Sequence, residues 1–217
     1  MMQYTLCLSI IVLLATSFPT ILIQSIFGNR TNRDDSRTIR AILIYNVILS
    51  LLVFRLIKLN LLTYMADRFS IIWLVLCIII ALILLMVEIQ VSYVIACYKN
   101  RERIKLKLEF VGNIKNAIDC TCIIINSIFE EYIYRYVWML VLIIVFDLPI
   151  ALVILIQGLI FAYNHRLLGI EIVAGKFFTA IVLGIIFAYT GNLFYPIIIH
   201  ILMNSIICYF SMRCKHE

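Results

Sequence analysis

The stretch that decides the fold class is FSIIWLVLCIIIALILLMVEIQVSYVIACY, residues 69–98, in which Glu88 is the only charged side chain. A helix needs about 20 apolar residues to cross the hydrocarbon core of a bilayer. This run is longer than that, so it can span a membrane while tilted. The sequence therefore predicts a membrane-spanning helix here.

The rest of the chain has the same character. Of its 217 residues, 65% are hydrophobic and 14% charged, against about 45–50% and about 25% in soluble domains. This composition excludes a soluble globular domain, a disordered tail and a nucleic-acid-binding module. It predicts an all-α fold, a polytopic transmembrane helical bundle of about seven spans, or eight with a broken helix. Residues 1–217 are expected to form a single domain. The apolar runs are 4–27, with a kink expected at Pro19, then 39–57, 69–98, 117–146, 149–168, 177–190 and 193–212.

The lysines and arginines predict the orientation of the chain. Most of the 18 lie in the first, third and fifth connections and in the C-terminal tail, which alternating spans place on one side. Because cytoplasmic loops are rich in Lys and Arg, we expect the C-terminus in the cytoplasm and the N-terminus outside. The net charge of +6 is thereby assigned to topology. Residues 100–116 alternate basic and apolar side chains, which suits either an amphipathic helix on an anionic leaflet or a solvated loop.

The seven cysteines lie mostly inside the apolar runs, and their odd number is not that of a secreted disulfide framework. We expect them to be small residues of the membrane core. Cys214 is fourth from the end, but the Lys215 and His216 that follow it are not aliphatic, so the tail is not a prenylation box.

Ionisable side chains inside the apolar runs are the informative ones. A charge at the bilayer centre costs about 2.5–3.5 kcal/mol on insertion scales, so it is expected to face a partner or a wet cavity. Three runs carry such groups, all within the core segment 117–212. They are Glu130, Glu131 and Arg135 in the first of these runs, His165 in the second, and His200 with Asn204 in the third.

Helical spacing assigns these residues to faces. Glu131 and Arg135 are separated by four residues, so they share a face and can neutralise each other. Glu130 is rotated by about 100° from its neighbour and is free to face a cavity. Phe161 and His165 also share a face, as do His200 and Asn204. Helices bury such polar patches against each other, so we expect them to converge within the membrane.

A carboxylate, two imidazoles and a carboxamide suit hydrolysis. A carboxylate and an imidazole can deprotonate water, and the remaining N–H donors can stabilise an oxyanion. Alternatively, Glu130, His165 and His200 offer three ligands for a zinc ion with an open fourth position, although no H-E-x-x-H helix is present. The residues alone leave both possibilities open.

Three motifs carry a resemblance to a known family. Residues 130–135 (EEYIYR) fit EExxxR, residues 161–165 (FAYNH) fit FxxxH, and residues 200–204 (HILMN) fit HxxxN. They occur in that order, each on its own apolar run. Together they resemble the CPBP intramembrane protease family, named for CAAX proteases and bacteriocin-processing enzymes and also called the Abi family.

The resemblance implies a role for each residue. Glu130 and His165 would activate the attacking water, and His200 and Asn204 would bind the oxyanion or, in the metal view, help to hold zinc. The supporting residues would be Glu131, Arg135 and Phe161. The family's activity implies a glutamate-dependent endopeptidase acting on a peptide or protein substrate in the lipid bilayer. For small bacterial relatives it implies bacteriocin or peptide maturation, or self-immunity.

Two other hypotheses remain from different classes of protein. The chain would otherwise be a non-catalytic membrane immunity protein, or a proton-coupled transporter that uses the Glu/His cluster as a relay. Glu88 is interpreted as a structural residue, because no motif accompanies it. The expected runs also place His165 near the cytoplasmic end of its span and His200 nearer the outer side, too far apart for one bonded network. The two would be reconciled by a fifth span that extends through residues 166–175, by a later start of the seventh, or by broken helices around a water-filled funnel.

Overall fold

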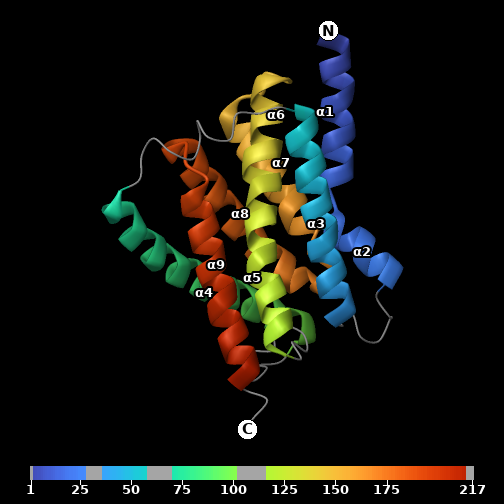
Figure 1. Ribbon diagram of the computed structural model, residues 1–217. Coiled ribbons are helices and arrows are strands. Elements are labelled where there is room, and N and C mark those ends of the chain that lie inside the picture. Colours follow the sequence, from blue (N-terminus) through green and yellow to red (C-terminus); the bar gives the residue numbers. More distant parts are fainter. Residues whose placement is uncertain (1, 28–35, 58–69, 102–115, 214–217) are drawn as a thin grey trace.

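The protein is a bundle of helices (Figure 1). Its structure is a computed structural model, which describes residues 2–27, 36–57, 70–101 and 116–213. The predicted all-α polytopic fold class is confirmed. No strand occurs in those ranges. The elements are α1 (Met2–Thr16), α2 (Pro19–Phe27), α3 (Ser36–Ile57), α4 (Ile71–Asn100), α5 (Ala117–Glu131), the π-helical η2 (Tyr132–Trp138), α6 (Met139–Ile144), α7 (Ile150–Tyr163), the 3₁₀ turn η3 (Arg166–Leu168), α8 (Ile170–Thr190) and α9 (Phe194–Arg213).

The number of spans differs from the expected seven. Among the described residues, four helices are long and apolar enough to cross a membrane, and a bent pair raises the number to five. The four helical stretches are Ser36–Arg55, Ile71–Asn100, Ile170–Thr190 and Phe194–Arg213. The expected run 117–146 is helical over 117–144, but the π-helical segment divides it into three pieces. The count of about seven is therefore not confirmed.

The boundaries of two expected spans are corrected. The fifth run was expected over 149–168, but α7 has only 14 residues and is about 21 Å long, against about 30 Å of hydrocarbon. The sixth run was expected over 177–190, but α8 begins at Ile170. The first two turns of α8 carry Glu171 and Lys176, and these charges interrupt the apolar pattern, so hydropathy places the start of this helix too late.

The break between α1 and α2 is held by residues far away in the chain. The two helices are bent by 53° around Pro19, as expected of a proline at the start of a helix. The first amides of α2 have no partner within the helix, and Asn164 supplies one: its Oδ1 accepts from the backbone N–H of Thr20 at 3.0 Å. Asn164 Nδ2 also donates to Thr20 Oγ1 at 2.9 Å. This buried cap fastens α2 beside His165.

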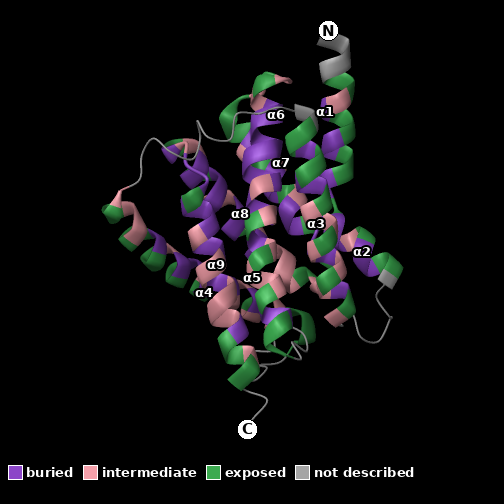
Figure 2. Cartoon of the chain, viewed as in Figure 1, coloured by how far each residue is buried: buried purple, intermediate pink, exposed green. Residues whose placement is uncertain are grey.

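A large cluster of buried residues lies along η2 and α6, in the upper part of the bundle in Figure 2, and a second cluster lies between α4, α8 and α9. Ile133, Tyr134 and Arg135 have no exposed surface. Outward faces are instead apolar and exposed, most clearly on α4, where Ile71 and Ile72 are 77% and 72% exposed. A large exposed apolar surface of this kind is what a lipid-facing helix presents, and it supports a membrane protein.

The ends of the described helices bear on the predicted orientation. The helix ends that flank the basic connections lie in the lower half of Figure 1, namely the end of α4, the start of α5 and the end of α9. Residues 102–115 of the amphipathic segment lie outside the described residues, as does Cys214. Which end faces the cytoplasm stays a prediction.

Of the cysteines expected in the core, Cys77, Cys120 and Cys208 are buried, whereas Cys7 is exposed.

Candidate active site

The first motif lies where the helix changes from α to π geometry. Glu130 and Glu131 are the last residues of α5, and Arg135 lies inside η2. The N–H of Tyr132 is shared between the carbonyls of Ile128 and Phe129, at the junction where the α-helical pattern of α5 ends. π-Helical turns occur frequently at functional sites, because they change the direction in which side chains point.

Glu131 and Arg135 form the ion pair that their spacing predicts. Arg135 Nε lies 3.0 Å from Glu131 Oε2, and both side chains are fully buried. The guanidinium lies over the Phe161 ring, 4.6 Å from its centroid. Its two terminal nitrogens have no hydrogen-bond partner among the described residues, and the guanidinium instead makes a cation–π interaction with this ring. Phe161 thus contacts Arg135 as well as the histidine that follows it.

His165 lies just beyond the end of α7 and is buried. Its Nδ1 is 2.9 Å from the carbonyl oxygen of Phe161, and its ring packs 4.9 Å from the Phe161 ring. A carbonyl only accepts hydrogen bonds, so Nδ1 carries the proton. In the neutral ring, Nε2 is then left with its lone pair, which can accept a hydrogen bond from water.

His200 lies between the two carboxylates of the first motif. Its Nδ1 is 2.7 Å from Glu131 Oε1, and its Nε2 is 3.8 Å from Glu130 Oε2. An ionised Glu131 accepts the Nδ1 proton and thereby orients the ring, as a carboxylate commonly does for a functional histidine. In its imidazolium form, His200 presents a second N–H on the side of Glu130. Glu131 is thus shared between Arg135 and His200.

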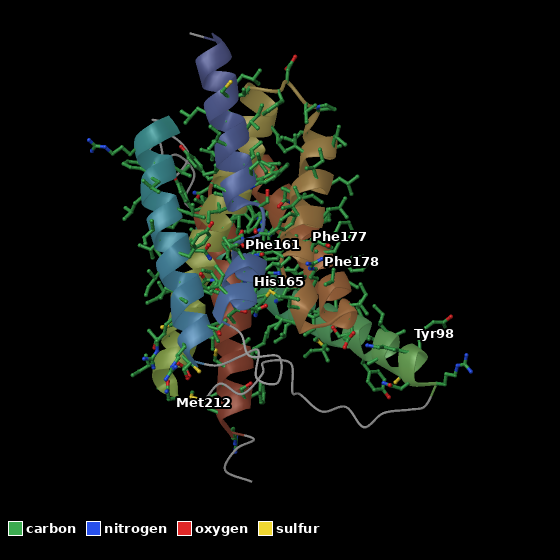
Figure 3. All side chains as sticks on the ribbon, turned by 90° about the vertical axis from the view of Figure 1, so that its right-hand side faces the viewer. Tyr98, Phe161, His165, Phe177, Phe178 and Met212 are labelled. Atoms are coloured by element: carbon green, nitrogen blue, oxygen red, sulfur yellow. The ribbon has the colours of Figure 1, made fainter. Side chains whose placement is uncertain are left out.

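The two histidines, expected at different depths, lie close together. The Phe161 ring is 4.9 Å from that of His165 and 6.0 Å from that of His200. Figure 3 shows Phe161 and His165 at mid-height in the bundle, well above Met212 at the lower end of α9. The expected separation is corrected because the short α7 ends inside the bundle, which brings His165 to the level of His200.

His165 and His200 line one cavity of about 320 Å³. At ~30 Å³ per water, the cavity has room for several waters or a short stretch of peptide. Its polar wall contains all four of the residues expected to be catalytic, Glu130, His165, His200 and Asn204. The rest of the wall is largely apolar, with residues from α3, α4, α5, α8 and α9, such as Ile42, Leu85, Ile123, Ile172 and Phe210.

Two asparagines missed by the sequence analysis hold Glu130. Asn126, one turn earlier in α5, donates from Nδ2 to Glu130 Oε1 at 2.8 Å. Asn126 Oδ1 in turn accepts from Asn46 Nδ2 of α3, also at 2.8 Å. This second bond determines which way the Asn126 amide faces, so that its N–H₂ group is directed at the carboxylate. The spacing of Asn126 and Glu130 is a signal in the sequence, but the contact with Asn46 is not.

Replacing Asn126 with Ala should lower kcat by about 10- to 100-fold, because a hydrogen bond to a charged group contributes ~1.5–3 kcal/mol. KM and the amount of protein in the membrane should stay the same, since Asn126 only orients the carboxylate. The measurement is steady-state cleavage of any peptide substrate. Thr121→Ala is the matched control, because Thr121 is exposed on α5 and bonds only the carbonyl of Ala117. An unchanged kcat in the Asn126 variant would contradict this role.

Asn204 has a partner of its own. One N–H of its amide donates to Ser127 Oγ at 2.8 Å, across the contact between α5 and α9. The amide has a second N–H, and the residue lines the cavity. Ser127 therefore fixes the amide group while leaving one donor available for an oxyanion.

The donor set expected for zinc was tested against this geometry. In the described part of the chain, no group of three or more His, Cys, Asp or Glu side chains is placed to hold a metal ion. The partners of His165 and His200 both bind Nδ1, which leaves Nε2 of each ring and is common for metal-binding histidines. Because the three donors are not placed together around one point, we derive no step through a metal, and zinc at Glu130, His165 and His200 stays a prediction.

Glu88 and Lys176 also line the cavity, which the sequence analysis did not foresee. Glu88 was interpreted as a structural residue without a partner, and Lys176 as part of a basic cytoplasmic connection. Lys176 instead lies within α8 and is buried, with its Nζ 2.7 Å from Glu88 Oε1. The early start of α8 explains the correction, since it draws residues of the expected connection into the bundle.

Fold and site together define a polytopic helical membrane protein with a hydrolase-like cluster of a carboxylate, two imidazoles and a carboxamide buried inside the bundle. Residues 120–206 match the model of the family described as Rce1-like, type II CAAX prenyl endopeptidase. The matched segment contains all three motifs, and the resemblance to the CPBP (CAAX protease) family is thereby confirmed. No curated protein and no solved structure matches the chain.

Proposed function

We propose that this protein is an intramembrane endopeptidase that hydrolyses a peptide bond of a membrane-associated peptide or protein. The single observation that carries the proposal is the convergence of Glu130, His165, His200 and Asn204 on one cavity. They come from three helical regions that are separate in the sequence, and all lie inside the segment that matches a CAAX protease family. That family suggests the reaction, and the geometry supplies groups suited to each of its steps.

Activation of water is assigned to Glu130 and His165. The carboxylate of Glu130, held by Asn126, takes a proton from a water in the cavity. The hydrogen that stays on the water oxygen donates a hydrogen bond to His165 Nε2, because the Nδ1 of this ring is committed to the carbonyl of Phe161. General-base catalysis of this kind contributes about 10²–10⁴-fold to a rate. The water oxygen then bonds to the carbonyl carbon of the substrate.

The oxyanion formed in this step is assigned to His200 and Asn204. The free N–H of the Asn204 amide and the Nε2–H of an imidazolium His200 can both donate to it, each worth ~3–4 kcal/mol when preorganised. Collapse of the intermediate breaks the C–N bond, and the proton held by Glu130 passes to the leaving amine. Glu130 is thereby returned to its carboxylate form. Glu131 acts only through its neighbours, by orienting His200 and neutralising Arg135.

The substrate proposed is a peptide or protein that is already in the bilayer, because the cavity lies among membrane helices and has a largely apolar wall. Maturation of an exported peptide, or immunity to a bacteriocin, is the physiological setting that we propose for it. Both settings require cleavage near the level of the lipid.

The proposal is tested with the purified protein in lipid nanodiscs, incubated with a panel of apolar, membrane-associated peptides and analysed by mass spectrometry. We expect a pair of fragments whose masses sum to that of the substrate plus one water. A protein that binds these peptides without cleaving any of them would favour the non-catalytic immunity protein. Peptide or ion flux that depends on a proton gradient, without fragments, would favour the transporter.

A further inference from the structure

The ion pair of Glu88 and Lys176 is a second charged feature of the cavity, and the proposed reaction does not use it. The side chains of Glu88 and Lys176 are 7% and 11% exposed. Paired charges in a membrane helix are costly to desolvate, and ionisable residues inside such helices commonly mark functional sites. Both residues nevertheless line the same cavity as Glu130 and His165.

The packing of α4 against α8 brings the pair together. Gly175 allows the close approach, since a Cβ at this position would lie 2.7 Å from Glu88 Cγ and 3.3 Å from the Glu88 backbone. One turn further along, Ser92 Oγ donates to the carbonyl of Glu171 at 3.0 Å. A small residue and a polar contact of this kind are typical of tightly packed membrane helices. The pair is therefore held in place by the backbones of both helices.

The two members of the pair differ in how fully their hydrogen-bonding capacity is used. Glu88 Oε1 faces Lys176 Nζ at 2.7 Å, and Glu88 Oε2 accepts from Thr179 Oγ1 at 3.2 Å, so both oxygens are engaged. An ammonium group has three N–H donors, and Glu88 accounts for one of them. The group with spare capacity at this place in the cavity is thus the cation.

The chemistry of the wall limits the kind of anion that fits. Lys176 is the only lysine or arginine among the described residues that line the cavity. A phosphate group carries more charge and is usually held by several donors or an arginine fork, whereas one lysine whose charge is balanced by Glu88 has N–H donors left for a single carboxylate at most. The surrounding apolar wall lowers the local dielectric constant and strengthens such a contact.

From this we infer that Lys176 is a substrate-binding residue that receives a carboxylate of the peptide, with Glu88 and Thr179 holding the ammonium in position. The inference rests on the proposed function and adds a specificity to it. The carboxylate is either the free C-terminus of the peptide or an acidic side chain. Bound by Lys176, it would fix which part of the peptide reaches Glu130.

The test measures binding, so that it does not depend on cleavage. A fluorescent hexapeptide of leucine and alanine is prepared in three forms: with a free C-terminal carboxylate, with a C-terminal carboxamide, and with a carboxamide plus one glutamate side chain. Binding to the Glu130→Gln protein in phosphatidylcholine nanodiscs is followed by fluorescence anisotropy. We expect one of the two carboxylate forms to bind about 30-fold more tightly than the uncharged form.

The double variant Glu88→Gln/Lys176→Met leaves no charge unpaired and should abolish this preference. The matched control is Lys99→Met/Glu171→Gln, which removes a second ion pair between α4 and α8 that the described residues form. This pair lies outside the cavity, with its charged atoms 3.9 Å apart, and the preference should persist. Equal binding of all three peptides by the parent protein would overturn the inference without any variant. A preference that survives loss of Lys176 would overturn it too. Absence of cleavage would instead count against the proposed function alone.

Discussion

Replacing Glu130 with Gln should lower the rate of peptide cleavage by about 10⁴-fold, the upper range of general-base catalysis, because this carboxylate both takes and returns the proton. The substitution keeps the volume of the side chain, and the new amide oxygen still accepts from Asn126 Nδ2. The amount of protein in the membrane and its thermal stability should therefore stay unchanged. The measurement is the cleavage rate at equal amounts of folded protein.

Glu171→Gln is the matched control for this variant. Glu171 is a partly exposed carboxylate in α8, outside the cavity, and pairs loosely with Lys99. Its replacement should leave the cleavage rate within about twofold, since a surface ion pair contributes ~1 kcal/mol or less. Cleavage by the Glu130 variant at the rate of the control would show that another group activates the water.

The second large effect is expected on stability. Arg135→Met should reduce the free energy of unfolding by about 3–5 kcal/mol and deplete the protein from the membrane, because Glu131 is left as a buried charge without its cation. The measurement is the unfolding temperature in detergent, together with abundance in membranes. Arg135→Met should also lower activity, because Arg135 holds the Glu131 carboxylate that orients His200.

Two further variants separate the ion pair from the ring contact. Arg166 also lies over an aromatic ring, 4.9 Å from the centroid of Tyr163, but on the surface. Arg166→Met should therefore have little effect on stability. Combining Arg135→Met with Glu131→Gln removes the unpaired charge and should recover much of the lost stability without restoring activity. An Arg135 variant as stable as the Arg166 variant would refute the buried pair as a determinant of stability.

The local parts of this site could be predicted from the sequence. A spacing of four residues within one helix implies contact, and Glu131 and Arg135 are indeed paired at 3.0 Å. The same reasoning placed His165 beside Phe161, whose rings lie 4.9 Å apart. The membrane environment made these residues conspicuous, because each polar side chain stands in a run of apolar ones.

The remainder depended on contacts between distant segments. The bond from Asn46 to Asn126 joins residues 80 apart in the chain, and the cap that Asn164 places on α2 joins residues 144 apart. Asn46 and Asn164 have no local signal in the sequence, because an asparagine in an apolar run is compatible with many roles. Lys176 was misplaced because Glu171 and Lys176 interrupt the apolar pattern at the start of α8, so hydropathy alone begins the run at residue 177. The short α7 and the early start of α8 are three-dimensional facts that put it in the cavity.

The most direct test of the central claim is cleavage in water enriched in oxygen-18, with the parent protein and the Glu130→Gln variant compared at equal amounts. We predict that the parent protein produces a fragment whose new C-terminal carboxylate carries one heavy oxygen, and that the variant produces almost none. Fragments without the label, or equally labelled fragments from both proteins, would contradict hydrolysis by a water activated at Glu130.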